Sequence, residues 1–320
     1  MSVSSKIMDR IKRDYGEELF EVLSSEMSSP DLQSLLLEVY RQRVADSSPR
    51  QLAKQFKENR FVQPSSIDPR LFLKLDELAF FLSSDYEAIE LSPLSPLGCN
   101  AIIAPVDQNN AISTIRNTEV CSDSTNMLAL IAAQRRAGML RKNPKSSETV
   151  KLSASHRVVR GQLFQGAASV PHFRLFSLVT AGRDTGSFSF QTKALVEHIE
   201  FYLQYLQALT KFDICLRNII VTITDFSGTK EALLESDVLV PLRGKFANVK
   251  IQFDPDREQG NGYYEIVGFQ IFAQHTDESS LLLIDGGFTN WTQQVLNNNK
   301  ERLLISGMGV ERICMCFPEI

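Results

Sequence analysis

The feature that most constrains the fold is a series of apolar, β-forming segments in the C-terminal half of the chain. These segments are residues 218–226, 249–253, 263–274 and 280–284. Strands that follow one another without intervening helices pair antiparallel, because a parallel pair needs a long crossover connection. An amphipathic pattern over 193–209 predicts a helix with His198 on its polar flank. The sequence therefore predicts an α+β fold, in which an antiparallel sheet is flanked by helices.

The N-terminal part of the chain has a different, helical pattern. Apolar residues recur at helical spacing between residues 7 and 23 and again between 32 and 40. Ser-Pro pairs at 29–30 and 48–49 are start signals for two further helices. We therefore predict a small helical module over residues 1–66 and a main domain over 67–320. The basic side chains of the helical module could contact a polyanion, although the interspersed acidic residues favour a solvated surface.

Composition narrows the class of protein. The chain has 320 residues, of which 43% are hydrophobic and 22% charged, as in ordinary soluble domains. A net charge of -4 argues against a surface that coats nucleic acid. No apolar run reaches the ~18 residues of a membrane span, so we expect no membrane partner. The five cysteines form no Cys-x-x-Cys pair and the four histidines are scattered. We therefore expect reduced thiols, no protein-bound metal and a cytoplasmic location.

The end of the chain carries a glycine-rich motif, Gly307-Met308-Gly309-Val310-Glu311-Arg312. Its two glycines would let the backbone approach a ligand closely. Arg312, one turn into a predicted helix, has a guanidinium that can stack on a ring or form two parallel hydrogen bonds to a phosphate. Taken alone, the motif fits equally well a strand end that precedes an amphipathic helix. It predicts a strand, a tight turn and a helix, and leaves ligand binding open.

A second group of candidate residues lies on a predicted hairpin. Its strands cover residues 150–164 and 173–181, and a loop over 165–171 joins them. The polar and aromatic residues near the mouth of this loop are Arg160, Gln162, His172, Arg174 and Phe176. Arginine can fork to phosphate and stack over adenine, which suits a nucleoside triphosphate. An exposed cationic hairpin is the alternative interpretation.

A third candidate is the run Ser122-Asp123-Ser124-Thr125, which precedes a helix predicted from residue 126 to about 136. Asp123 and Thr125 have side chains that cap a helix N-terminus. The same side chains could bind the amino group of a ligand. The residue pattern supports both roles equally.

In their order along the chain, these motifs resemble those of the class II aminoacyl-tRNA synthetases, most closely the histidyl-tRNA synthetase branch. The resemblance covers about residues 68–320. The matching segments are Tyr86 to Pro93 (motif 1), Ser122 to Thr125, Arg160-Gly161-Gln162 with His172 and Phe176 (motif 2), Asp254-Pro255, Gln259 to Tyr264, Asp285-Gly286-Gly287, and Gly307 to Arg312 (motif 3).

This resemblance implies a nucleotide site for ATP and Mg²⁺, with Arg160 and Arg312 as catalytic residues. Arg160 would hold the α-phosphate and the substrate carboxylate, and Arg312 the γ-phosphate. Phe176 would stack on adenine, and His172 would approach the terminal phosphates. The remaining ATP-binding candidates are Gln162, Gly307 and Gly309. The substrate-binding candidates are Asp123, Thr125, Gln259, Tyr263, Tyr264, Gly286 and Gly287. The resemblance also implies a homodimer through motif 1.

The chain departs from the branch in ways that bear on function. Gln162 replaces the motif 2 glutamate, and Gln259 replaces the arginine before the Tyr-Tyr pair. Phe288-Thr289-Asn290 stands in place of Arg-Tyr-Asp. Because a buried imidazole without its acceptors is costly, histidine is not expected as the substrate. Only residues 313–320 follow motif 3, where the branch has an anticodon-binding domain, so we expect no ordinary charging of transfer RNA.

Two functions follow from the resemblance. The first is ATP-dependent adenylation of another amino acid or similar small carboxylic acid, passed to a carrier, small molecule or protein acceptor. The second is a non-catalytic regulatory or scaffold subunit, resembling the histidyl-synthetase-like partner of the short ATP phosphoribosyltransferase. The intact arginines favour the first function, whereas the loss of an arginine at Gln259 favours the second.

Overall fold

The computed structural model describes residues 3–162, 169–274 and 279–317, so residues 165–168 of the predicted loop lie outside the described part. The chain divides into two compact units. One comprises Met1–Gln63 with Ser113–Thr118, and the other comprises Pro64–Ile112 with Glu119–Ile320. The short segment 113–118 within the first unit has no counterpart in the sequence prediction.

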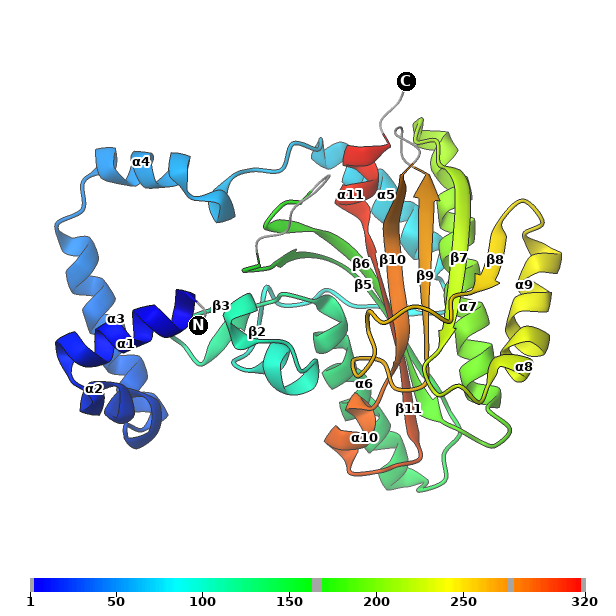
Figure 1. Cartoon of the computed structure of the whole chain (residues 1–320), viewed down its shortest axis with the longest axis horizontal. Coiled ribbons are helices and arrows are strands. Elements are labelled where there is room, and N and C mark those ends of the chain that lie inside the picture. The colour runs from blue at the N-terminus through cyan, green and yellow to red at the C-terminus, as the bar shows by residue number, and fades with distance from the viewer. Residues whose placement is uncertain (1–2, 163–168, 275–278, 318–320) are drawn as a thin grey trace. The chain divides into compact units, whose positions relative to one another are not determined.

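The first unit is helical (Figure 1). Its helices are α1 (Val3–Tyr15), α2 (Glu17–Glu21), α3 (Ser29–Ala45) and α4 (Pro49–Glu58). Ser28 caps α3, and Ser48 caps α4 in a reciprocal arrangement with Gln51. None of α2, α3 and α4 contains a fully buried residue. Local capping therefore contributes more to the stability of these helices than burial in a core does. A separate role for this part of the chain stays a prediction.

The second unit is built on an eight-stranded sheet. In order across the sheet, the strands are β1 (Glu87–Ala88), β5 (Val150–Val159), β6 (His172–Arg183), β11 (Glu301–Gly309), β10 (Ser280–Thr289), β9 (Val267–Gln274), β7 (Arg217–Asp225) and β8 (Lys250–Phe253). Only the two outer pairs, β1 with β5 and β7 with β8, are parallel. The predicted antiparallel sheet is confirmed. A separate sheet has the order β2 (Leu94–Pro96), β4 (Thr118–Val120) and β3 (Ile112–Ser113).

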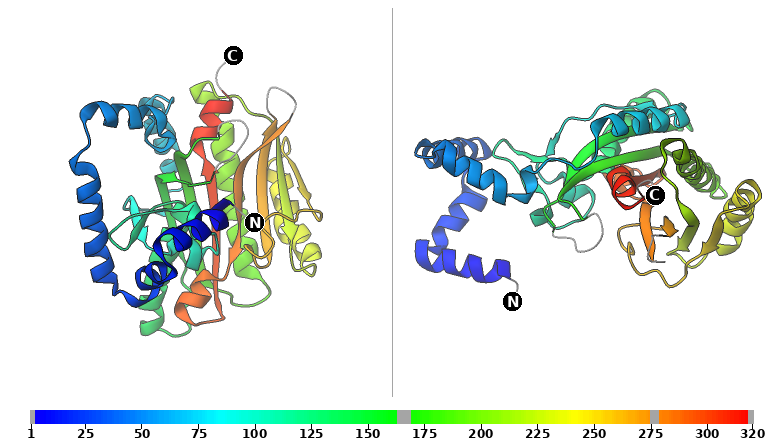
Figure 2. Two further views of the ribbon diagram at one scale, coloured as in Figure 1. Left: turned by 60° about the vertical axis from the view of Figure 1, so that its left-hand side comes forward. Right: turned by 90° about the horizontal axis from the view of Figure 1, so that it is seen from above.

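Helices cover both faces of the large sheet (Figure 1). On one face lie α5 (Pro69–Leu82), α7 (Ser189–Ala208), α8 (Glu231–Leu234), α9 (Val240–Lys245) and α11 (Val310–Cys316). On the other face lie α6 (Ser124–Lys142) and α10 (Trp291–Leu296). In both views of Figure 2, α8 and α9 (yellow) lie at the edge formed by β7 and β8. No helix among the described residues is long and apolar enough to cross a membrane.

A buried ion pair fastens α6 to the sheet. Arg136 donates from Nε to Glu301 Oε2 at 2.7 Å and from Nη2 to Oε1 at 2.9 Å. Its Nη1 donates to the carbonyl oxygen of Glu148 at 2.7 Å. Both charged side chains are 0% exposed. This two-bond contact joins the C-terminal half of α6 to the first residue of β11.

His198 of α7 lies in the interior rather than on the predicted polar flank, and it is 0% exposed. Its Nε2 is 2.9 Å from Thr180 Oγ1 and its Nδ1 is 2.8 Å from Ser306 Oγ. The prediction was wrong because the hydroxyls of β6 and β11 provide a polar strip beneath an otherwise apolar helix face. Burial, together with the positive charge of the nearby Lys151, lowers the pKa of His198 to about 3.

The buried imidazole makes stability dependent on pH. Between pH about 6.5 and about 3 the unfolded chain binds a proton at His198 that the folded chain does not. Stability from this group is therefore present above pH 6.5 and is lost as pH falls, by about 1.4 kcal/mol per unit. In urea unfolding at pH 7, 6 and 5, the free energy of unfolding should fall more steeply with decreasing pH for the native protein than for His198→Gln. Equal dependence on pH in the two proteins would contradict the lowered pKa of His198.

Candidate active site

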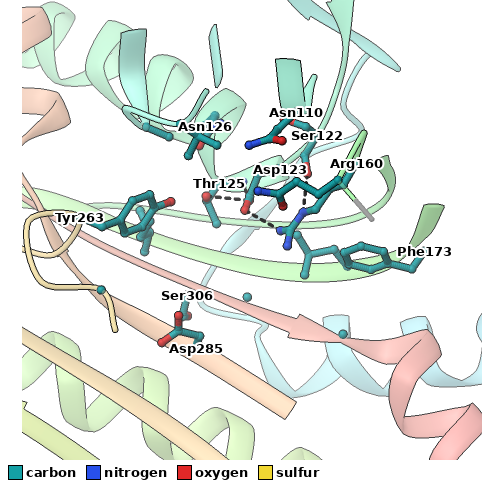
Figure 3. Close-up of a pocket in the computed structure, with 18 of the residues that line it drawn as sticks. Asn110, Ser122, Asp123, Thr125, Asn126, Arg160, Phe173, Tyr263, Asp285 and Ser306 are labelled. Carbon is teal, nitrogen blue, oxygen red and sulfur yellow. Dashed lines mark hydrogen bonds and ion pairs between the residues drawn. The ribbon is translucent and has the colours of Figure 1, made fainter. Parts of the chain in front are cut away.

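A cavity of about 600 Å³ opens beside the N-terminus of α6 (Figure 3). The start of α6, the first part of β6, the first half of β10, the second half of β11 and the loop 259–264 all contribute lining residues. The segment 100–110 covers a further side. Residues far apart in the sequence thus meet around one space of the size that takes small-molecule ligands.

Most of the candidate residues from the sequence meet at this cavity. The lining includes Asp123, Thr125, Arg160, Gln162, Gln259, Tyr263, Tyr264, Gly307, Gly309 and Arg312. It does not include four other candidates, His172, Phe176, Gly286 and Gly287. The motifs at residues 122–125, 160–162, 259–264 and 307–312 therefore define one site, whereas the roles of the residues in it stay predictions.

Phe176 does not face the cavity, so the prediction that it stacks on a base is wrong. The residue is 0% exposed, and its ring centre lies 5.5 Å from that of Phe80 and 5.4 Å from that of Phe201. Side chains alternate between the two faces of a strand, and β6 turns Phe173 to the cavity instead. Sequence reasoning missed Phe173 because it assigned the strand to the wrong face.

The same alternation turns His172 away from the cavity. Its Nδ1 lies 2.8 Å from Nη1 of Arg157, on the face that carries Phe176. Arg174, between them on this face, pairs with Asp76 of α5 at 3.5 Å. The expected contact of His172 with terminal phosphates therefore has no support in the geometry.

Gly286 and Gly287 of β10 make room for aromatic rings rather than for a ligand. A Cβ on Gly286 would lie 2.6 Å from the ring of Phe269, and one on Gly287 would lie 2.5 Å from that of Tyr264. The predicted direct contact with substrate is replaced by close packing. Through that packing, Gly287 lets the Tyr264 ring reach the wall of the cavity.

Asp123 caps a helix, as one interpretation of its motif predicted, and it also lines the cavity, so its binding of a ligand's amino group stays a prediction. Its Oδ1 accepts hydrogen bonds from the backbone N–H of Thr125 at 2.9 Å and from the hydroxyl of Thr125 at 2.8 Å. Its Oδ2 accepts one from Nη2 of Arg160 at 3.1 Å. The cap fixes the carboxylate at the start of α6, and the second oxygen pairs with a cation in the cavity (Figure 3).

Two arginines converge on this space from different elements. Arg160 follows β5, donates from Nε to the carbonyl oxygen of Ser122 at 3.2 Å, and lies 5.1 Å from the ring centre of Phe173. Arg312 of α11 donates to the carbonyl oxygen of Leu282 at 3.1 Å. Burial lowers the pKa of Arg312, and the positive charge of Arg160 lowers it further. Two cations that line one partly buried cavity favour an anionic ligand.

Sequence reasoning missed an ion pair between Arg257 and Asp285. Arg257 is 8% exposed, and its Nη2 donates to Asp285 Oδ1 at 2.9 Å. Its guanidinium lies 5.6 Å from the ring centres of both Phe226 and Tyr264. Burial raises the pKa of Asp285, and Arg257 opposes that rise. The resemblance directed attention to Gln259, two residues after this arginine.

Glu119 was also missed, although it organises one wall of the cavity. The residue is 1% exposed and accepts hydrogen bonds from Gly98 N at 3.0 Å, Asn100 N at 2.8 Å and Gln108 Nε2 at 2.6 Å. These bonds hold both ends of the segment 98–108, which lines one side. A lone glutamate in a short strand gave no signal of this role.

The sheet, the helices on both of its faces and the position of the cavity define a class II aminoacyl-tRNA synthetase-like fold. Histidyl-tRNA synthetase from S. aureus has a similar structure, with a TM-score of 0.53 and 16% identity over 75% of this chain and 62% of that chain. The ATP phosphoribosyltransferase regulatory subunit/histidyl-tRNA synthetase from Bacillus halodurans is also similar, with a TM-score of 0.53 and 11% identity over 81% of this chain and 82% of that chain.

A histidine–tRNA ligase subunit from Alicyclobacillus acidocaldarius matches at a TM-score of 0.53 and 11% identity, over 79% of this chain and 96% of that chain. No protein-family model and no curated protein sequence matches. At these identities the likeness shows the fold, which confirms the predicted synthetase-like core. The chain spans less than two thirds of the S. aureus enzyme.

Proposed function

We propose that this protein binds ATP in the cavity and uses it to adenylate an amino acid or similar small carboxylic acid other than histidine. The observation that carries the proposal is the convergence of Arg160 and Arg312 on one cavity. Arginine keeps its charge at neutral pH and forks to phosphate, so such a pair supports binding of a polyphosphate.

The residues present fit a nucleotide. The volume of about 600 Å³ lies in the usual range for small-molecule sites. The Phe173 ring beside Arg160 offers a stacking surface for a base. Magnesium would enter with the phosphates, because Mg²⁺ keeps several waters and needs only one or two carboxylates. The carboxylates that line the cavity are those of Asp123 and Asp285. No preformed group of three or more metal-ligating side chains occurs among the described residues.

In the proposed reaction, a carboxylate oxygen of the substrate attacks the α-phosphorus of ATP. The bond from that phosphorus to the bridging oxygen breaks, and pyrophosphate leaves with the electron pair. Negative charge grows on the phosphoryl oxygens, where fixed cations stabilise it most. We assign this stabilisation to Arg160 and Arg312. A carrier, small molecule or protein would then take the acyl group, as the bond between the acyl carbon and the phosphate oxygen breaks and AMP leaves.

Assembly as a homodimer through motif 1 is part of the proposal. In this region β1 forms an edge of the large sheet. On the preceding helix α5, Leu73 is 69% exposed and Phe81 is 75% exposed. An open sheet edge and exposed apolar side chains are each typical of a contact between subunits.

ATP–pyrophosphate exchange tests the proposed activity. Exchange should occur with at least one acid in a panel of amino and small carboxylic acids, and it should require Mg²⁺. Calorimetric titration with ATP gives an independent measure of nucleotide binding. The absence of both exchange and ATP binding would contradict the proposal. ATP binding without exchange would instead favour a regulatory subunit, as in the name of the Bacillus halodurans protein.

A further inference from the structure

We infer that the substrate of this cavity is an amino acid with a positively charged side chain, held by an acceptor subsite that Asn126 and Asp285 form. The inference rests on the proposed function and names the substrate class of the same cavity. It follows from a buried amide oxygen without a donor and from a carboxylate that faces the same cavity.

Asn126 supplies the first observation. It lies in the first turn of α6, lines the cavity and is 2% exposed. Its Oδ1 has no hydrogen-bond partner among the residues that the structure describes. Leaving a buried amide oxygen without a donor costs about 1–3 kcal/mol. A ligand with an N–H group would remove that cost.

Asp285 supplies a second acceptor on a different wall of the cavity (Figure 3). Arg257 holds one of its oxygens, Oδ1, from behind. The Asp285 side chain is 41% exposed, whereas that of Arg257 is only 2% exposed. Tyr264 and the backbone N–H of Gly286 also donate to this carboxylate. It is therefore oriented by several partners, while its exposed part faces the cavity.

Tyr263 connects this subsite to the arginine side of the cavity. Tyr263 lines the same cavity as Asp123 and Asp285. Burial raises the pKa of its hydroxyl, both carboxylates raise it further, and Arg160 opposes that rise. Asp123 is already paired with Arg160. Asp285 and Asn126 are then available to a second nitrogen of the substrate.

The chemistry of these groups selects the charge of that second group. A carboxylate and an amide oxygen are both acceptors, so an ammonium or guanidinium, which only donates, satisfies them fully. A carboxamide would bring an acceptor of its own into the same space. Hydrogen bonds between a cation and a carboxylate are also stronger than neutral ones. The subsite therefore favours a basic side chain over an amide, acidic or aliphatic one.

The inference is tested by calorimetric binding to the full chain, with and without ATP, using matched amino acids. The probes are lysine, ornithine and arginine, with norleucine, norvaline and glutamine as analogues that lack the positive side chain. We expect at least one basic amino acid to bind at least about tenfold more tightly than its analogue. Asp285→Asn and Asn126→Leu should each reduce that preference, and Asn126→Leu keeps the test valid if Asp285→Asn does not fold.

Asp256→Asn is the matched control, because Asp256 is exposed in the same loop as Arg257. It should keep the native preference, and thermal unfolding should show that each variant is folded. Equal binding of basic and aliphatic probes, no binding of any basic probe, or a preference that both variants leave unchanged would overturn the inference. Preference for a basic amino acid without pyrophosphate exchange would overturn the proposed activity alone.

Discussion

Replacing Arg160 with alanine is expected to lower the rate of ATP–pyrophosphate exchange by roughly 100- to 1,000-fold. The guanidinium lies between the carboxylate of Asp123 and the ring of Phe173, in the cavity where phosphoryl charge would develop. Its loss removes fixed positive charge and leaves Asp123 without its cationic partner. The measurement is initial exchange rate at saturating ATP and acid.

Arg160→Lys separates the effect of charge from that of geometry. Lysine keeps the charge but cannot form two parallel bonds, so we expect activity between that of the native protein and that of the alanine variant. Arg217→Ala, at an exposed position on β7, is the control for loss of an arginine and should exchange at the native rate. Native activity in Arg160→Ala would rule out the assigned role.

Glu301→Gln is expected to destabilise the protein by about 3–5 kcal/mol, because it leaves the Arg136 cation buried without a counter-charge. Urea unfolding at neutral pH measures this loss. The exposed pair of Arg243 and Glu235 provides the matched control. Glu235→Gln should change the free energy of unfolding only slightly, since water screens that pair.

The double variant Arg136→Met with Glu301→Leu tests whether the charges themselves cause the loss. Replacing a whole buried ion pair with apolar side chains is often near neutral, whereas removing one partner is not. The double variant should therefore recover most of the stability that Glu301→Gln loses. A double variant as unstable as the single one would show that shape at this position matters more than charge.

The sequence predicted the fold well where strand patterns were long and uninterrupted. The antiparallel sheet follows from consecutive β-forming segments, which leave few alternatives to antiparallel pairing. The boundaries were less accurate. Asp285-Gly286-Gly287 lies inside β10 rather than after it, and the predicted strand over 263–274 begins only at Val267. Pairing with a neighbouring strand, which a local pattern does not contain, sets such ends.

The site was predicted in part. Arg160, Asp123 and Arg312 line the cavity, as expected from the short motifs that contain them. Phe176 was misplaced because an error of one position on a strand exchanges its two faces. The pair of Arg257 and Asp285 could not be predicted, since a contact between residues 28 positions apart depends on tertiary packing. Asn126 carried no signal, because an unused hydrogen-bonding atom can be recognised only after its surroundings are known.

The three hydrogen bonds to Glu119 have a consequence for the kinetics of ligand binding. They hold the segment 98–108 in place before any ligand arrives, so binding need not include the entropy loss of ordering that wall. On this side the cavity is preorganised, and association need not wait for a slow closure step. Differences in affinity among substrates should then arise mainly in their dissociation rates.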